Sequence, residues 1–287
     1  MPSLIDLRRR IRSVKSTQQV TKAMKMVSAA KLRRAQERVI AARPYAAMFG
    51  RILGDLAAAV AGDETAEGHP LLARRPENRI LLVLVTADRG LAGAFNTNLL
   101  KASHHFIVEH APATVQMNLI GRKGRDYWRK RGASVMAERT GISEKPTFDH
   151  AVAVAKEIAG TFERNETDAV YLLFNEFKSV LSQKLTLARL LPVELPVRSS
   201  SVDFIYEQPP AELLASLLPR FVEISIYQAM LESAAAELAA RMTAMEAATS
   251  NAGEMIDKLT LYMNRVRQAS ITNQLIEVVS GATAAQE

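Results

Sequence analysis

The sequence predicts an α/β domain with a doubly wound sheet, inserted between two long helices that form a coiled coil. Proline is missing between Ser3 and Arg43 and again after Pro219, whereas nine prolines interrupt the middle of the chain. Glycine is similarly rare at the ends, since none precedes Gly50 and only two follow Gly160. Because proline and glycine disfavour helix interiors, each end is predicted as a continuous helix. In the middle, short aliphatic runs alternate with helical stretches, which is typical of α/β folds.

The composition is that of a folded protein without cysteine. Of the 287 residues, 48% are hydrophobic and 23% are charged, which excludes disorder over the whole length. The lack of cysteine excludes disulfides, thiolate metal sites and cysteine nucleophiles. No apolar run approaches the roughly 18 residues of a membrane span, and no secretory apolar stretch follows the Arg-rich amino terminus. We therefore expect neither a membrane span nor a signal peptide, and a chain that stays on the cytoplasmic side.

Charge divides the chain into three regions. Residues 1–50 carry 12 Lys or Arg against two acidic residues, whereas residues 207–287 carry 5 against 10. Opposite charge favours side-by-side ends, although exposed pairs contribute only about 0–1 kcal/mol each. Three regions are therefore predicted: an N-terminal coiled-coil helix over 1–60, an α/β domain over 77–206 and a C-terminal coiled-coil helix over 210–287.

A heptad repeat runs along the predicted C-terminal helix. Thirteen of fifteen positions spaced alternately by four and three are apolar. The positions are Leu217, Phe221, Ile224, Gln228, Leu231, Ala235, Leu238, Met242, Met245, Thr249, Ala252, Ile256, Leu259, Met263 and Val266. This spacing predicts a left-handed supercoil with another helix. The N-terminal helix offers a partner stripe, which is Leu4, Leu7, Ile11, Val14, Val20, Met24 and Val27. Pro219 is expected either to kink the C-terminal helix or to delay its start.

The repeat ends before the chain does. Polar residues then occupy the core positions, and apolar residues surround the tip, namely Leu275, Ile276, Val278 and Val279. A tip that is apolar on several faces either inserts into a surrounding partner or frays as a disordered end.

The middle region contains the predicted strands and shorter helices. The strands are Arg79–Thr86, Thr114–Ile120, Asp168–Asn175 and, at the edge of the sheet, Lys184–Leu190. The helices are Phe95–His110, Lys123–Lys130 and His150–Arg164. This alternation predicts a parallel sheet covered by helices.

Two segments of the middle region are candidate sites. The loop Asp88–Asn96 follows a predicted strand and holds Gly90 and Gly93, but it lacks the spacing of a phosphate-binding motif. We interpret it as a tight strand-to-helix turn rather than a nucleotide site. The segment Gly121–Arg131 combines basic and aromatic residues, which fits either a nucleic-acid patch or a solvated helix face, and we favour the helix face.

Catalytic and metal-binding patterns are not evident in the sequence. His104 and His105 are adjacent, so they lie about 100° apart on a helix and are poorly placed to share a metal. No Ser/His/Asp set or tuned carboxylate pair stands out. We expect no catalytic residue, no cofactor and no metal site. The basic N-terminal helix could bind phosphate backbones, but its apolar stripe favours a protein partner.

Several motifs make the sequence similar to one family, the gamma subunits of F-type ATP synthases. The first helix holds MKMVSAAKLRRAQ at 24–36, and the loop holds DRGLAGAFN at 88–96. The last helix holds AMEAATSNAGEMIDKLTL at 244–261, then NRVRQASIT at 264–272 and VSGA at 279–282. The resemblance covers essentially the whole chain and is highly specific.

The resemblance implies an antiparallel coiled coil of the terminal helices with an inserted Rossmann-like α/β domain at its base. It also implies the function of a rotor subunit that couples ion flow through a membrane ring of c subunits to ATP synthesis or hydrolysis on beta subunits, and that regulates ATPase activity. The implied partners are the ring of three alpha and three beta subunits, the epsilon subunit and the c ring, with one copy of this chain per complex. The chain itself would be non-catalytic.

The resemblance also assigns contact residues. Contacts with beta subunits are implied for Met24, Lys25, Arg267, Gln268 and Thr272. The apolar tip, Leu275 to Val279, would turn as a bearing inside the collar of the ring. The loop motif is Asp88, Arg89, Gly90 and Gly93.

The sequence departs from the family at three positions. Ala92 replaces a frequent cysteine, Met263 interrupts a Tyr-Asn pair, and Gln274 replaces a common glutamate, which leaves the role of position 274 open. Neither a transit peptide nor a dithiol loop is evident, so we expect a bacterial protein on the cytoplasmic face of the inner membrane. Two other functions remain as alternatives: a nucleic-acid-binding coiled-coil protein and a nucleotide-using α/β enzyme.

Overall fold

The chain forms two compact units in the computed structural model, which describes residues 3–60, 68–194 and 208–284. One unit is Ser28–Arg241, and the other combines Met1–Val27 with Met242–Glu287. Parts of the predicted regions, namely 1–2, 195–206 and 285–287, lie outside the described residues. The division into 1–60, 77–206 and 210–287 remains a prediction.

A long helix lies at each end of the sequence, as predicted. Helix α1 spans Leu4–Ala59 and helix α6 spans Pro210–Ala284. Because α6 begins upstream of Pro219, that proline does not delay its start. None of the helices in the described ranges contains an apolar stretch that would span a bilayer.

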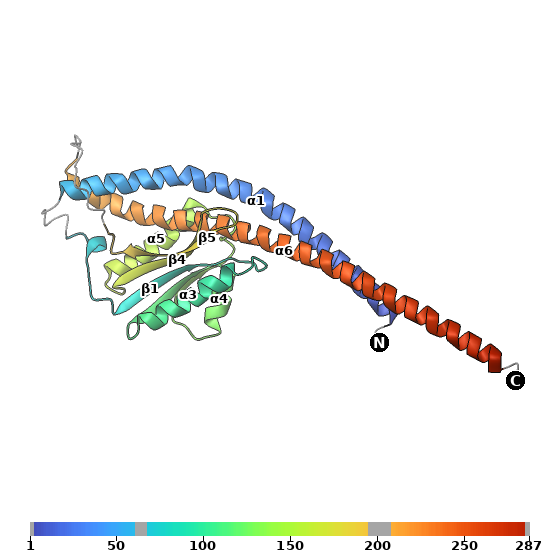
Figure 1. Ribbon diagram of the computed structural model, residues 1–287. Coiled ribbons are helices and arrows are strands. Elements are labelled where there is room, and N and C mark those ends of the chain that lie inside the picture. Colours follow the sequence, from blue (N-terminus) through green and yellow to red (C-terminus); the bar gives the residue numbers. More distant parts are fainter. Residues whose placement is uncertain (1–2, 61–67, 195–207, 285–287) are drawn as a thin grey trace. The chain divides into compact units, whose positions relative to one another are not determined.

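A mixed five-stranded sheet lies between the two long helices in sequence (Figure 1). Its strands are β1 (Arg79–Val85), β2 (Thr114–Ile120), β3 (Val135–Arg139), β4 (Ala169–Phe177) and β5 (Gln183–Leu191). The order is β3-β2-β1-β4-β5, with β5 antiparallel to β4 and every other pair parallel. Four strands confirm the predicted segments, including the edge strand, whereas β3 was not predicted.

Helices cover both faces of this sheet (Figure 1). They are α3 (Phe95–Glu109), α4 (Arg122–Arg129) and α5 (Phe148–Glu163), and the 3₁₀ helix η1 (Pro70–Leu72) precedes β1. Successive side chains of a strand point to opposite faces. Leu81, Val83 and Val85 face a core made with α5 and with the segments of α1 and α6 in the same unit. The opposite face carries α3 and α4, which contact β1 and β2.

Helix α6 is buried more widely than a heptad seam requires. All fifteen predicted seam positions are buried or partly buried. Between Val222 and Ala239, however, most residues outside the seam are buried as well, including Glu223, Glu232 and Glu237. This stretch is enclosed because its apolar residues also join the core beneath the sheet.

The predicted stripe on α1 is wrong at two positions. Val20 and Val27 are 54% and 55% exposed. The covered positions continue the spacing of four and three through polar residues instead, and they are Leu4, Leu7, Ile11, Val14, Gln18, Thr21, Lys25, Ser28, Leu32, Ala35 and Val39. The prediction selected positions because their side chains are apolar, whereas the regular spacing of four and three identifies the covered face.

Candidate functional site

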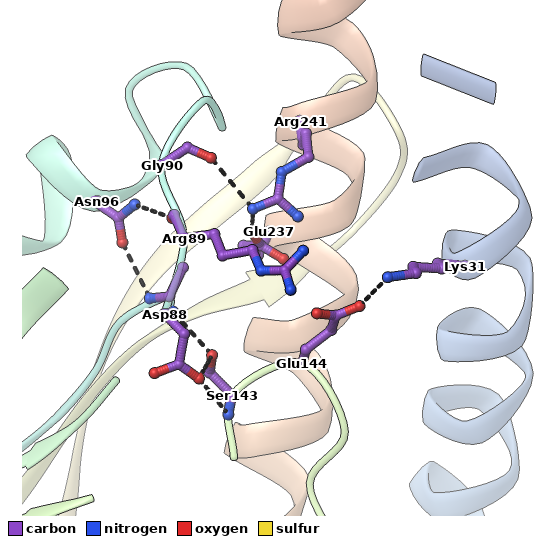
Figure 2. Close-up of polar contacts among 10 residues, drawn as sticks. Lys31, Asp88, Arg89, Gly90, Asn96, Ser143, Glu144, Glu237 and Arg241 are labelled. Atoms are coloured by element: carbon purple, nitrogen blue, oxygen red, sulfur yellow. Dashed lines mark hydrogen bonds and ion pairs between the residues drawn. The ribbon is translucent and has the colours of Figure 1, made fainter. Parts of the chain in front are cut away.

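The loop after β1 is held by the carboxylate of Asp88. Its oxygens accept hydrogen bonds from the backbone N–H groups of Arg122 (3.0 Å), Gly141 (2.9 Å) and Ser143 (3.2 Å). The Ser143 hydroxyl also donates to it at 2.6 Å (Figure 2). Burial by itself would raise the pKa of Asp88, but these donors outweigh it and hold the pKa below its usual value. The ionised side chain therefore ties the loop to two neighbouring segments of the sheet layer.

This arrangement explains why the glycine-bearing loop need not hold a phosphate. Arg122 is the first residue of α4, where a helix N-terminus favours an anion. The Asp88 carboxylate already accepts from that N–H group. Preceding it, Gly121 has a φ of 97°, and a Cβ there would lie 2.1 Å from the Thr86 carbonyl oxygen. These contacts favour our interpretation of the loop as a structural turn.

Asn96 closes the same loop from its other end. Its side-chain oxygen accepts from the Ala87 N–H at 3.0 Å, and its amide donates to the Arg89 carbonyl at 3.4 Å. Between these bonds, Leu91 and Gly93 adopt positive φ values of 65° and 55°. The residues of the DRGLAGAFN motif thus hold one another in a fixed turn.

A charged cluster connects this loop to the long helices within the same unit. On α6, Arg241 donates to the Gly90 carbonyl at 3.3 Å and pairs with Glu237, one helical turn away. Lys31 of α1 pairs with Glu144, which follows β3. Figure 2 shows the Arg89 side chain extending towards these carboxylates. The loop motif is therefore one side of a junction between the sheet layer and both long helices.

The carboxylates of this cluster have different environments. The pKa of Glu237 is raised to about 7, chiefly by burial, although Arg241 opposes the rise. The pKa of Glu144 is lowered, chiefly by the hydrogen bond from Lys31. The predicted site residues did not include Lys31, Glu144, Glu237 and Arg241. Their signal in the sequence is weak, because Glu237 and Arg241 flank the apolar seam at a spacing of four that exposed ion pairs on helices share.

A second ion pair joins the long helices to the sheet. The Arg43 guanidinium of α1 donates to the Glu232 carboxylate of α6 at 2.8 and 3.0 Å, and to the Phe177 carbonyl of β4 at 2.6 Å. Glu232 also accepts from the Phe177 N–H at 3.0 Å. The Glu232 side chain is only 2% exposed. Its charge is thus compensated by three bonds from two other elements.

In the other unit, α1 and α6 meet through polar residues. The Thr249 hydroxyl donates to Thr21 at 2.8 Å, and the Gln18 amide donates to the Thr249 carbonyl at 3.5 Å. Lys25, a predicted contact residue, pairs with Glu246 at 2.5 Å. Its neighbour Met24 is partly buried.

The remaining predicted contact residues lie near the end of α6. Arg267, Gln268 and Thr272 are exposed, and the Thr272 hydroxyl donates to the Gln268 carbonyl at 3.0 Å. The predicted tip residues are exposed as well: Leu275, Ile276, Val278 and Val279. Gln274 is also exposed. The structure therefore leaves this apolar segment accessible to another molecule.

The basic aromatic segment of α4 does not form a stacking surface. Trp128 is buried, and its indole N–H donates to Ser103 of α3 at 3.2 Å. Arg131 lies over the Tyr127 ring at 3.6 Å, and Arg129 pairs with Glu138. The aromatic ring of Trp128 is thus packed in the interior while the basic residues face solvent, which favours a solvated helix face over a nucleic-acid patch.

Comparison with known proteins identifies the family. The family described as ATP synthase matches residues 3–285. The "ATP synthase gamma chain" of Solibacter usitatus is 64% identical over 286 residues and covers 100% of both chains. That of an Anaeromyxobacter species (strain Fw109-5) is 50% identical and covers 99% of both.

Solved structures share the fold at lower identity. A chain of the Euglena gracilis mitochondrial ATP synthase aligns with a TM-score of 0.69 and 19% identity, over 98% of this chain and 94% of that chain. A chain of the Tetrahymena thermophila mitochondrial ATP synthase central stalk and c ring aligns with a TM-score of 0.59 and 23% identity, over 80% and 99%. By its full-length identity to the curated relatives, this chain belongs to the ATP synthase gamma chain family.

Proposed function

We propose that this chain is the central-stalk rotor subunit of an F-type ATP synthase. It couples ion flow through a c ring to ATP synthesis or hydrolysis at the catalytic sites of beta subunits. The observation that carries this proposal is 64% identity, over the whole length of both chains, with a curated ATP synthase gamma chain. Identity at this level over the whole length of both chains favours the same role for this chain.

The contacts between α1 and α6 support an antiparallel coiled coil as the shaft. In one unit, Thr21 bonds Thr249 and Lys25 pairs with Glu246. In the other unit, Arg43 pairs with Glu232. As the residue number on α1 rises along these pairs, the residue number of its partner on α6 falls, which is the pattern of antiparallel helices. Covered positions spaced by four and three on both helices agree with coiled-coil packing.

The strand order supports a Rossmann-like domain as the foot of the shaft. The parallel order β3-β2-β1-β4, with helices on both faces, is half of a doubly wound sheet. Asp88 accepts from the Arg122 N–H at the N-terminus of α4 and from the Gly141 N–H after β3, so this domain serves as a structural foot rather than a nucleotide site. In the assembly it meets the epsilon subunit and the c ring, at the cytoplasmic face of a bacterial inner membrane.

The upper part of the shaft would turn inside the ring of three alpha and three beta subunits. Met24 and Lys25 contact the lower region of beta, and Arg267, Gln268 and Thr272 contact one beta loop. The exposed apolar residues from Leu275 to Val279 form the bearing tip, because burial in a ring collar would remove their apolar surface from water. One copy per complex presents a different face to each beta subunit.

This asymmetry explains how a non-catalytic subunit controls catalysis. A ligand or partner shifts an equilibrium only through different contacts with each state. A single shaft makes different contacts with each of three beta subunits, so their nucleotide sites take different conformations. Rotation then moves each site through the same sequence of states.

Co-purification from detergent-solubilised membranes tests this function. A tagged copy of this chain is expected to recover alpha, beta, epsilon and c subunits, with ATPase activity in the complex and none in the isolated chain. Substantial hydrolysis by the isolated chain would overturn the non-catalytic role. Recovery of nucleic acid at physiological salt, without those subunits, would support the alternative of a nucleic-acid-binding protein.

A further inference from the structure

A semi-enclosed cavity of about 190 Å³ lies between α1, α6 and the segment that follows β3, all within the unit Ser28–Arg241. Its apolar walls come from three elements, and the residues are Ala35, Pro146, Leu231, Ala234 and Leu238. Small side chains explain the space, because Ala35 on α1 and Ala234 on α6 stand where larger residues would fill it. An unfilled apolar cavity forfeits dispersion contacts, so an occupant that restores them is stabilised there.

Cations surround the cavity. Lys31, Arg34, Arg38 and Lys145 line it together with one acid, Glu144. Lys31 pairs with Glu144, which leaves Arg34, Arg38 and Lys145 without a carboxylate partner among the described residues. Arg34 and Arg38 are one helical turn apart and both exposed, so their guanidinium groups can reach the same point. The mouth therefore carries excess positive charge beside an apolar interior.

We propose that this cavity binds a small amphipathic anion, namely a short-chain alkyl carboxylate such as a free fatty acid. The carboxylate lies at the mouth, where Arg34, Arg38 and Lys145 provide charge-assisted hydrogen bonds. The alkyl chain lies against Ala35, Ala234 and the leucines of α6. This site is independent of the proposed contacts with beta subunits and of the bearing tip.

The volume limits the size of the ligand. An engineered apolar cavity of roughly 150 Å³ accommodates benzene. The present cavity is slightly larger, so it fits an apolar body on the order of six carbons, whereas drug-sized ligands need about 300 Å³ or more. Hexanoate is therefore a suitable probe.

Titration of the purified full-length chain with hexanoate, followed by NMR or calorimetry, tests the proposal. We expect a dissociation constant on the order of 1 mM for a ligand of this size. Affinity should rise about fourfold per methylene from butanoate to hexanoate, because each buried methylene adds a similar increment, and should level off once the cavity is full. Acetate lacks the chain and 1-hexanol lacks the charge, so each should bind at least tenfold more weakly. Equal affinity for hexanol and hexanoate, or no saturable binding of hexanoate, would overturn the proposal.

Substitutions locate the site on the protein. The double variant R34Q/R38Q should weaken hexanoate binding about tenfold or more, with little change in the weak binding of hexanol. Arg33 is the matched control, because its side chain is 84% exposed, pairs with Glu37 and does not line the cavity. R33Q should bind hexanoate like the parent chain. Equal losses in R33Q and in the single variants R34Q and R38Q, each of which removes one charge, would reduce the effect to net charge and contradict a built site.

A filled cavity provides the complementary test. A234M and A35L each place a larger apolar side chain in the space and should abolish binding of the whole alkyl series. Circular dichroism establishes that each variant is folded, and the two variants approach the cavity from different helices. Undiminished hexanoate binding in either folded variant would exclude this cavity as the site.

Discussion

Replacing Arg43 with methionine should destabilise the protein, because it leaves the buried carboxylate of Glu232 without its cationic partner. The substitution removes both bonds to Glu232 and the bond to the Phe177 carbonyl, while methionine keeps the apolar stem of the side chain. Glu232, which is 2% exposed, is left with the Phe177 N–H as its described donor. Breaking a buried pair by removing one partner typically costs about 3–5 kcal/mol.

The expected cost here lies below that range. The Arg43 side chain is 40% exposed, so water can reach part of the vacated space and solvate the carboxylate. We therefore expect R43M to lower the free energy of unfolding by about 2–3 kcal/mol at pH 7.5. Urea denaturation followed by circular dichroism measures this difference. R33M is the matched control and should remain within about 0.5 kcal/mol of the parent, because exposed pairs contribute little.

A double variant identifies the cause of the loss. R43M/E232Q should recover part of the lost stability, since the second change removes the orphaned charge. A cost below about 0.5 kcal/mol for R43M, or a further loss in the double variant, would refute this reasoning.

Three other substitutions test the site and the shaft. The pKa of Glu237 is raised from an ordinary 4.5 to about 7, so the folded state retains a proton that the unfolded state loses, and the stability of the parent should fall as pH rises through this window. E237Q lacks that titration, so its stability relative to the parent should rise by up to about 3 kcal/mol between pH 4.5 and 8 in urea denaturation, and an unchanged difference contradicts the assignment. Asp88 has a lowered pKa, so its stabilisation is present above its ordinary pKa and is lost as pH falls through the lower folded value. D88N should therefore cost about 1–3 kcal/mol at pH 7 and little at acid pH, and a pH-independent cost would argue against the ionised role. The side chains of Lys25 and Glu246 are 36% and 60% exposed, so water weakens their ion pair, and K25A should change the stability of the isolated chain by less than about 1 kcal/mol. The same substitution should reduce ATP-driven ion pumping in membrane vesicles, and unaltered pumping would count against the contact with beta.

The helices and strands with a regular sequence pattern were predictable from the sequence. The long helices follow from missing proline and glycine, and β1 is a continuous aliphatic run that must be buried on both faces. Strand β3 was missed because Val135–Arg139 is short and carries Glu138 and Arg139. Its backbone pairing with β2, and the pairing of Arg139 with Glu157 of α5, stabilise a segment whose local pattern is weak.

The candidate site was predictable only in its position. The DRGLAGAFN motif identified the loop, but the hydrogen bonds of Asp88 depend on Gly141 and Ser143, which tertiary structure brings near. The charged cluster of Glu237 and Arg241 was hidden for a similar reason, because a surface pair and a buried pair at a spacing of four look the same in sequence. Val20 shows the opposite case, an apolar residue that the helix leaves in solvent.

Rotation of single complexes tests the central claim most directly. Alpha and beta subunits are assembled with this chain, the ring is fixed to a surface, and a bead is attached to a cysteine placed at Lys130, an exposed residue in the turn after α4 of a chain that otherwise has no cysteine. Addition of ATP should drive continuous rotation of the bead in one direction. Hydrolysis of ATP by the same complexes, with a bead that only fluctuates about one angle, would contradict the role of this chain as the rotor.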